Sequence, residues 1–187
     1  MDAYLEIRVL PDPEFMPTML MNALFSKLHR GLVMHGGQTI GVSFPDVRDN
    51  SRSLGERLRV HGDEEELEKL MTLNWLIGMR DHLMIGDIAN VPIHAKPRVV
   101  RRVQAKSSPE RQRRRLMARK GVSPEQAHRA IPDEAAEKLD LPYLVLASQS
   151  TGQQFRLFIE HMPIQDLAVP GQFSAYGLST TGTVPWF

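Results

Sequence analysis

The chain of 187 residues contains no cysteine. This absence excludes disulfide bonds, thiolate metal sites and a cysteine nucleophile, and it fits a cytosolic protein. No apolar run approaches the length of a membrane span, and the N-terminal segment MDAYLEIRVL is acidic where a signal peptide needs basic residues. We therefore expect a soluble, cytoplasmic protein that does not associate with a membrane.

Clusters of metal-binding side chains are also missing. The acidic residues lie mainly between Glu64 and Glu68 and in predicted turns, and no two of the seven histidines have the spacing of a metal pair on a helix. Hydrolytic metal sites in nucleases need clustered carboxylates or histidines, so a metal nuclease is poorly supported. We expect no metal and no cofactor.

Positive charge, in contrast, is concentrated between Lys96 and Lys120. This stretch holds eleven of the 23 lysine and arginine residues against a single acid. Ser108 as N-cap and Gly121 just past the end predict a helix over 109–120. Arginines at i, i+3, i+4 and i+8 then project from one side of that helix: Arg111, Arg114, Arg115 and Arg119. Such a face fits phosphate and predicts a nucleic-acid partner, the alternative being a solvated basic surface.

The charge is divided unevenly between the two halves of the chain. Residues 1–95 carry 9 basic and 14 acidic side chains, whereas residues 96–187 carry 14 and 8. This asymmetry predicts two domains, 1–95 and 96–187, and places the surface for the polyanion on the second domain.

The first half has the pattern of alternating strands and helices β-α-β-β-α-β. The predicted elements are strands over 4–10, 40–44, 56–61 and 83–91 and helices over 15–34 and 64–70. This order predicts a ferredoxin-like domain of four antiparallel strands backed by two helices. A smaller α/β C-terminal domain with the arginine-rich helix follows, so the predicted fold class is α+β.

RNA-recognition modules share the ferredoxin-like architecture, but they present aromatic residues on a central strand to stack bases. The corresponding strand of this chain reads RLRVH over 57–61 and has no aromatic residue. We therefore expect RNA contacts mainly from the second half. There, a strand over 99–104 would place Arg102 and Gln104 on one face, where both can hydrogen-bond base edges. Ordinary solvent-facing alternation explains this pair equally well.

Further elements are predicted after the arginine-rich helix. A capping box at Ser123 to Gln126 begins a second helix, and strands over 141–147 and 155–160 are expected to form a hairpin around a hydroxyl-rich turn.

A nuclease that needs no metal is possible on RNA, because the 2′-hydroxyl can attack the adjacent phosphate once a side chain removes its proton. Histidine is the natural base for this step. His29 lies about 80° from the middle of the apolar stripe of the first helix, at roughly 100° per residue. From that border position it can face a cleft, or it can simply be half-buried.

Several motifs give the chain a resemblance to a known family. They are YLEIRVLPDPEF, GVSFPD, LGERLRVH, RVQAKSSPERQRRRLMARK, SQSTGQQFRLFIEH and YGLSTTGTVPWF, and the resemblance that they carry covers essentially the whole chain. In this order they resemble the CRISPR RNA-processing endoribonucleases of type I-F systems, the Csy-type members of the Cas endoribonuclease superfamily. The resemblance implies that the chain binds the stem-loop of the CRISPR repeat and cleaves the precursor RNA at the 3′ base of the stem.

The resemblance also implies roles for individual residues. His29 corresponds to the base that activates the 2′-hydroxyl, Ser148 to the residue that holds that ribose, and Tyr176 to the tyrosine that orients the histidine. The resemblance implies RNA contacts by Arg102, Gln104, Arg114, Arg115, Arg119, Ser150, Thr151 and Phe155. Among these, Phe155 corresponds to the aromatic residue stacked on the terminal base pair. We also expect Arg111 and Lys120 of the cationic helix to bind RNA. The implied product carries a cyclic phosphate and stays bound as the enzyme joins the other subunits of the surveillance complex.

Two positions depart from the family pattern. Ala118 stands where relatives have a basic residue, and Lys120 stands where they have a histidine. Loss of one cation removes about one phosphate contact. Two other hypotheses remain open at this point: a non-catalytic subunit that only binds an RNA hairpin, and a regulator that places the arginine-rich helix in the major groove of duplex DNA.

Overall fold

The computed structural model describes residues 1–105, 109–133, 139–148 and 152–187. They form two compact units, one of Met1–Val103 with Leu141–Phe187 and one of Gln104–Asp140. Ser108, the predicted N-cap, lies outside the described residues. The structure has two antiparallel sheets and four α-helices in its described part, which confirms the α+β class. The compact units do not divide at residue 95, because both sheets belong to the larger one.

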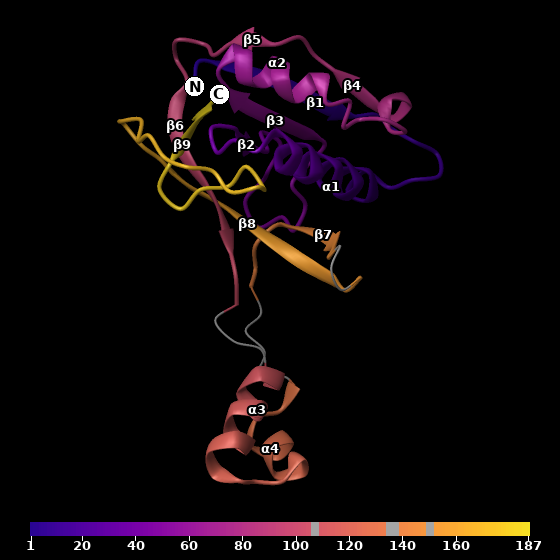
Figure 1. Ribbon diagram of the computed structural model, residues 1–187, viewed down its shortest axis with the longest axis vertical. Helices are drawn as coiled ribbons and strands as arrows, with labels where there is room; N and C mark the ends of the chain where they lie inside the picture. The colour runs from indigo at the N-terminus through magenta and orange to yellow at the C-terminus, as the bar shows by residue number, and fades with distance from the viewer. Residues whose placement is uncertain (106–108, 134–138, 149–151) are drawn as a thin grey trace. The chain divides into compact units, whose positions relative to one another are not determined.

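The first sheet of the larger unit is built from residues 3–90. Its strands are β1 (Ala3–Val9), β2 (Gly41–Ser43), β3 (Arg57–Gly62) and β4 (Leu83–Ile85), in the order β2-β3-β1-β4. Each neighbouring pair is antiparallel, and the short strand β5 (Ala89–Asn90) also pairs with β1. The single strand expected over 83–91 is therefore two strands, separated around Gly86 (Figure 1).

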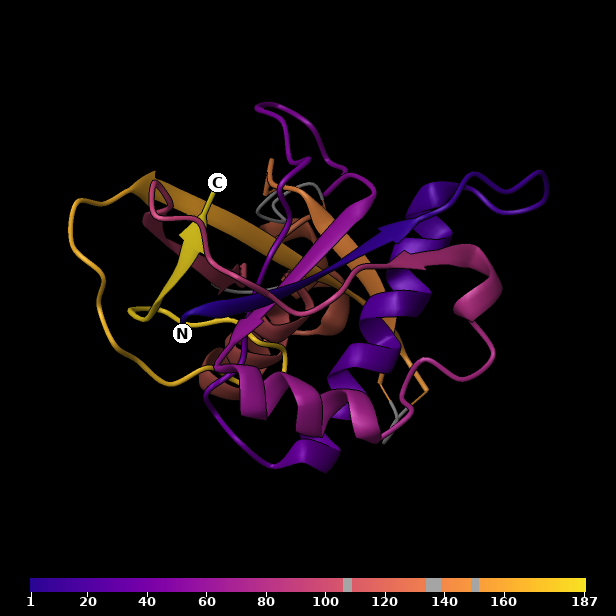
Figure 2. The ribbon, with the colours of Figure 1, turned by 90° about the horizontal axis from the view of Figure 1, so that it is seen from above.

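Two helices cover one face of this sheet. They are α1 (Pro17–His35) and α2 (Glu64–Thr72), and Figure 2 shows both on the same side of β1 and β3. Alternation along β1 buries the predicted apolar face of Leu5, Ile7 and Val9, none of which is more than 2% exposed. The helix α1 ends as predicted, because Gly36 adopts the left-handed conformation at the C-cap.

The start of α2 differs from the prediction in one respect. Asp63 holds the N-cap position, but its side chain makes no capping hydrogen bond. Its carboxylate instead pairs with the N-terminal ammonium of Met1 at 2.8 Å. A short 3-10 helix, η1 (Arg80–His82), leads from this region into β4.

The second sheet of the larger unit contains the strands of the C-terminal half. They are β6 (Lys96–Val103), β7 (Tyr143–Ala147), β8 (Gln154–Ile164) and β9 (Thr183–Trp186), in the order β7-β8-β6-β9. The predicted hairpin of β7 and β8 is present, although β8 is longer than expected. The strand β6 ends before Gln104, which therefore does not share a strand face with Arg102. No prediction was made for β9, which pairs with β6 at the sheet edge.

Buried polar side chains lie on the face of the first sheet that α1 and α2 leave uncovered. Arg59 is 5% exposed, pairs with Glu6 at 2.7 Å and donates to the carbonyl oxygen of Phe187 at 2.8 Å. Its guanidinium also lies 3.8 Å from the centroid of the Phe187 ring. These contacts hold the end of the chain against β3.

The smaller unit contains two helices, α3 (Pro109–Lys120) and α4 (Pro124–Ala130). The bounds of α3 are those predicted from Pro109 and Gly121, and Gly121 takes a φ of 60°. The capping box of α4 is present, because the Ser123 hydroxyl accepts from the backbone N–H of Gln126 and the Gln126 side chain accepts from the N–H of Ser123. No α-helix in the described part of the chain is long and apolar enough to cross a membrane.

Candidate active site

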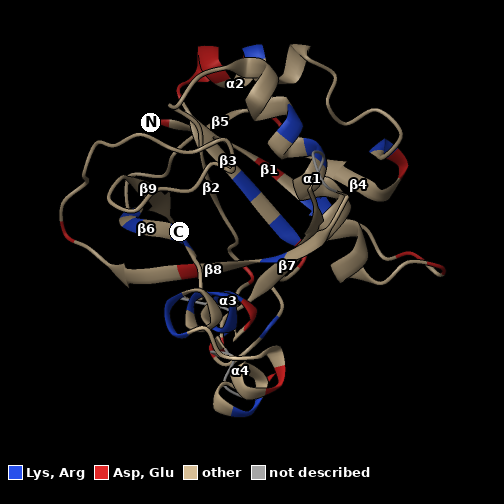
Figure 3. Cartoon of the chain, turned by 60° about the horizontal axis from the view of Figure 1, so that its bottom comes forward, with Lys and Arg blue, Asp and Glu red and all other residues tan. Residues whose placement is uncertain are grey.

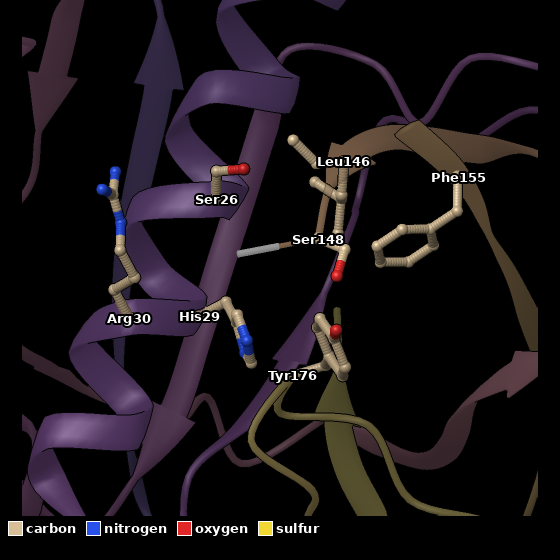
Figure 4. A pocket seen from close by; sticks show the side chains of 8 residues that line it. Ser26, His29, Arg30, Leu146, Ser148, Phe155 and Tyr176 are labelled. Atoms are coloured by element: carbon tan, nitrogen blue, oxygen red, sulfur yellow. The ribbon is translucent and has the colours of Figure 1, made fainter. Parts of the chain in front are cut away.

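A cleft of about 530 Å³ lies in the larger unit between α1, the end of β7 and the C-terminal tail (Figure 4). The residues that line it are Ser26, His29, Arg30, Leu146, Ala147, Ser148, Phe155 and Tyr176. Four of them, His29, Ser148, Phe155 and Tyr176, were predicted from the sequence to belong to a site. The fold thus brings these four residues to one place.

His29 lies on the side of α1 that faces the cleft and is half-buried. Its Nδ1 is 2.8 Å from the backbone carbonyl oxygen of Ala175. A carbonyl oxygen only accepts hydrogen bonds, so Nδ1 carries the proton and donates it. In the neutral ring, Nε2 then keeps a lone pair with which it can accept a proton.

Tyr176 forms the wall of the cleft beside His29. The two rings stack with centroids 4.2 Å apart and planes at 10°. The tail that carries Tyr176 is fixed to β2, because the backbone N–H of Val42 donates to the carbonyl oxygen of Gly177 at 2.9 Å. Gly177 has a φ of 67°, and a Cβ at this position would lie 2.7 Å from the side chain of Val42. A glycine is therefore needed for the tail to approach β2 this closely.

Ser148 follows the last residue of β7 on the opposite wall. Its backbone N–H donates to the carbonyl oxygen of Gln153 at 2.9 Å, and its own carbonyl accepts from the N–H of Gly152 at 2.8 Å. These two bonds join Ser148 to the residues just before β8. Figure 4 shows the Ser148 hydroxyl pointing to the same part of the cleft as Tyr176. The predicted residues Ser150 and Thr151 lie outside the described residues.

Arg102 lies beside the aromatic side of the cleft. Its guanidinium carbon is 5.9 Å from the centroid of the Phe155 ring and 5.8 Å from that of Tyr176. A cation at these distances is weakly attracted to both ring faces. The larger unit therefore places one exposed arginine next to two aromatic rings. Gln104 belongs to the smaller unit.

The predicted cationic face of α3 is present in the smaller unit, where Lys and Arg gather on the helix (Figure 3). Five basic side chains of α3 are exposed: Arg111, Arg114, Arg115, Arg119 and Lys120. Arg113 is different, because it donates to the carbonyl oxygen of Ile131 at 2.7 Å and pairs with Asp133. It joins α3 to the segment after α4, a role that the sequence analysis missed.

Histidine and carboxylate side chains do not gather into a metal centre in the described part of the chain. No three of them lie close enough together there to hold one metal ion. Two other histidines lie in buried surroundings: His61, which is hydrogen-bonded to the Ser43 hydroxyl at 2.8 Å, and His161, which lies beside Phe44 and Trp186. Neither lines the cleft.

The model of one protein family, described as CRISPR-associated protein (Cas_Csy4), matches residues 4–187 of the chain. The chain belongs to this Csy4 family. It is 56% identical over 187 residues to a protein of Pseudomonas aeruginosa (strain UCBPP-PA14) named CRISPR-associated endonuclease Cas6/Csy4. It is 47% identical over 187 residues to a protein of the same name from Escherichia coli (strain UTI89 / UPEC). Both alignments cover the whole of both chains.

Membership of the Csy4 family confirms the resemblance that was drawn from the motifs. The cleft of this family member also contains residues that the sequence analysis did not single out. Ser26 precedes His29 by three residues on α1, so helical spacing alone could have placed it on the same side. Arg30 directly follows His29 in the sequence, but a single arginine on a helix does not by itself distinguish a site residue from a solvated one. Ala147 has no functional atom in its side chain, so no pattern of residue types would have indicated it.

Proposed function

We propose that this Csy4-family chain is a metal-independent endoribonuclease that binds the stem-loop of a CRISPR repeat and cleaves precursor CRISPR RNA at the 3′ base of the stem. The observation that carries the proposal is the hydrogen bond from Nδ1 of His29 to the carbonyl oxygen of Ala175, which leaves Nε2 as a base in the cleft shared with Ser148. Relatives named as CRISPR-associated endonucleases support the class of reaction.

The chemical step uses the 2′-hydroxyl of the RNA as its own nucleophile. Nε2 of His29 takes the proton from this hydroxyl, and the 2′-oxygen attacks the adjacent phosphorus. The bond from phosphorus to the 5′-oxygen of the next nucleotide breaks, and that oxygen takes a proton from water. The products are a 2′,3′-cyclic phosphate and a free 5′-hydroxyl. No metal takes part in this sequence of bonds, and no cofactor is needed.

The other walls of the cleft have supporting roles in this proposal. Ser148 holds the ribose whose 2′-hydroxyl reacts, and Tyr176 keeps the imidazole in its plane by stacking against it. Phe155 stacks on the terminal base pair of the stem, and the exposed Arg102 contacts a base beside it. Gln104 is proposed to read a neighbouring base. Ser150 and Thr151 are proposed to contact the scissile phosphate.

The smaller unit supplies most of the binding free energy for the RNA. The exposed cations of α3 contact phosphates of the stem, where arginine forks match the geometry of phosphate oxygens. Because these contacts do not change on cleavage, the product stays bound as a guide RNA with its hairpin. We propose that the complex then joins other subunits of the type I-F surveillance complex. An RNA substrate made in the bacterial cytoplasm implies a cytoplasmic enzyme.

The first sheet is proposed to be a ferredoxin-like domain that supports the catalytic histidine. The element order β-α-β-β-α-β and the strand order β2-β3-β1-β4 support this assignment, as does the antiparallel direction of every neighbouring pair. In functional terms, residues 1–95 carry His29, and residues 96–187 provide the remaining RNA contacts. The second sheet nevertheless shares a compact unit with the first.

The experiment that tests the function incubates the protein with a repeat RNA in EDTA. We expect cleavage at one site, with a cyclic phosphate on the upstream product. The same RNA with a 2′-deoxy nucleotide at the scissile position should bind and stay intact. Cleavage of the 2′-deoxy RNA would exclude internal attack. Tight binding of the all-ribose RNA without cleavage would favour the second candidate, a non-catalytic hairpin-binding subunit.

A further inference from the structure

The strand β7 lies at the edge of the second sheet and has a partner strand on one side only. In an antiparallel pair, backbone N–H groups alternate between the partner strand and the outer edge. The carbonyl oxygen of Pro142 accepts from the amide of Ile159, and the amide of Ser148 donates to the carbonyl oxygen of Gln153. Because the direction alternates along the strand, the amides of the residues between them at odd positions point away from β8: Tyr143, Val145 and Ala147. The outer edge of β7 therefore carries a row of donors toward α1, and the last of them belongs to a residue that lines the cleft.

Two of these outward donors have partners from other parts of the chain. The amide of Tyr143 donates to the carbonyl oxygen of Arg52 at 3.2 Å. The amide of Val145 donates to Oδ1 of Asn22 on α1 at 3.0 Å. The Asn22 bond is a direct link between the helix that carries His29 and the strand that leads to Ser148.

The hydrogen bond between Asn22 and Val145 lies at about the same distance from His29 along α1 as from Ser148 along β7. Asn22 precedes His29 by two turns of α1, about 10.5 Å at 1.5 Å per residue. Val145 precedes Ser148 by three residues, about 10 Å at 3.3 Å per residue. Both elements run from the hydrogen bond toward the cleft, so the two walls that carry His29 and Ser148 begin at nearly equal distances from this bond. A shift of β7 along α1 at the bond therefore moves Ser148 past His29 by the same amount.

We propose that Asn22 is a positioning residue, which fixes the spacing of His29 and Ser148 by holding the edge of β7 against α1. The inference rests on the proposed ribonuclease function and adds to it a residue outside the cleft. Asn22 does not line the cleft in which the reaction is proposed to take place. Its effect is transmitted through Val145. A displacement of about 1 Å at a catalytic site reduces rates by about 100-fold.

Substitutions at this position separate positioning from stability. Asn22→Ala removes the acceptor while raising the helix propensity of α1, so a loss of rate cannot come from a weaker helix. Asn22→Asp keeps an acceptor oxygen at the same distance from the backbone. Asn22→Gln keeps the amide but carries it one methylene farther out. Val33→Ala, at an exposed position of the same helix, serves as the matched control.

The test measures single-turnover cleavage of a repeat RNA, affinity for the uncleavable 2′-deoxy RNA, and amide hydrogen exchange at Val145. We expect Asn22→Ala and Asn22→Gln to slow cleavage by about 10- to 100-fold, with affinity changed by less than about 3-fold and exchange at Val145 accelerated. We expect Asn22→Asp to restore cleavage to within about 3-fold of the wild-type rate and to keep the amide protected.

The outcomes distinguish this inference from the function on which it rests. A wild-type protein that binds the RNA without cleaving it would overturn the proposed function, and the role of Asn22 with it. Cleavage by the wild type and by Asn22→Ala at equal rates would overturn the role of Asn22 alone. If Asn22→Ala is slow, Asn22→Asp does not restore the rate, and affinity falls to the same extent as the rate, then Asn22 is a structural residue only and the proposal is overturned.

Discussion

The ring of His29 stacks on the ring of Tyr176, a residue of the C-terminal tail, with ring centroids 4.2 Å apart. The residue before Tyr176, Ala175, supplies the carbonyl oxygen that receives the proton of His29 Nδ1. The tail thus fixes both the plane and the tautomer of the imidazole.

Replacement of His29 by alanine should abolish cleavage while binding persists. A general base contributes about 10²- to 10⁴-fold to rate, and an imidazole adds little to an interface of arginine and phosphate. We expect a fall of at least 100-fold in the single-turnover rate and a change of less than about 3-fold in affinity. The exposed His94, replaced by alanine, is the control and should leave both unchanged. Equal loss of binding and cleavage would mean that His29 contributes to packing and has no part in catalysis.

Replacement of Tyr176 by phenylalanine should preserve the cleavage rate, whereas replacement by leucine should lower it. Phenylalanine keeps the flat ring that stacks on His29, whereas leucine leaves the imidazole free to turn about its hydrogen bond. We expect Tyr176→Phe to cleave within about 5-fold of the wild-type rate and Tyr176→Leu to be about 10- to 100-fold slower. Rates at saturating enzyme provide the measurement. A Tyr176→Phe variant as slow as Tyr176→Leu would show that the hydroxyl takes part instead.

Alanine variants of the α3 arginines should divide into two kinds when their affinity for the repeat RNA is measured at increasing salt concentration. Arg115→Ala and Arg119→Ala each remove one exposed cation, so each should weaken binding and reduce the slope of log K against log salt by about one unit.

Arg113→Ala removes a contact within the smaller unit instead, because this side chain is bonded to Ile131 and Asp133. It should lower the thermal stability of that unit and leave the salt slope nearly unchanged. Titrations from 50 to 300 mM salt, together with calorimetry, would test both expectations. A full unit of slope lost in Arg113→Ala would contradict the division.

The stability of the larger unit should fall as the pH drops below neutrality. Burial, with a further effect from Arg59, lowers the pKa of His61 from 6.5 to about 3. Burial, with a further effect from Arg98, lowers the pKa of His161 to about 3. Between these values the unfolded chain binds protons that the folded chain excludes, so the free energy of unfolding decreases as pH falls through that window.

The measurement is urea unfolding at pH 7.5, 6 and 5. Each histidine should contribute up to about 1.4 kcal/mol per pH unit within its window. His61→Gln keeps a hydrogen-bonding group for Ser43 but does not titrate, so this variant should show a shallower dependence on pH. An unchanged dependence in His61→Gln would mean that other groups dominate.

Elements with strong local signals were predictable from the sequence. The spacing of Leu20, Leu24 and Leu28 determined the apolar face of α1, and the alternation in β1 determined which side of the strand is buried. Pro109 and Gly121 defined the ends of α3 because they act through their own backbone preferences. Each of these signals works over a few neighbouring residues.

The strand β9 had no such signal. It contains Pro185 and follows a stretch rich in glycine, serine and threonine, and a proline within a run argues against a strand. It is a strand because it pairs with β6 along the edge of the sheet. The partners of Arg113 were hidden for the same reason, since Ile131 and Asp133 are close only after α4 has turned back.

The sequence by itself determined the α+β composition, the cationic side of α3 and, through its motifs, the family. Tertiary structure alone decided which atoms meet: His29 with Ala175 and Tyr176, and Asn22 with Val145. Helix and strand periods are fixed by backbone geometry within one element, and they can be read locally. The proton position on an imidazole depends on an acceptor from a distant segment, and only packing of the whole unit brings that acceptor within hydrogen-bonding distance.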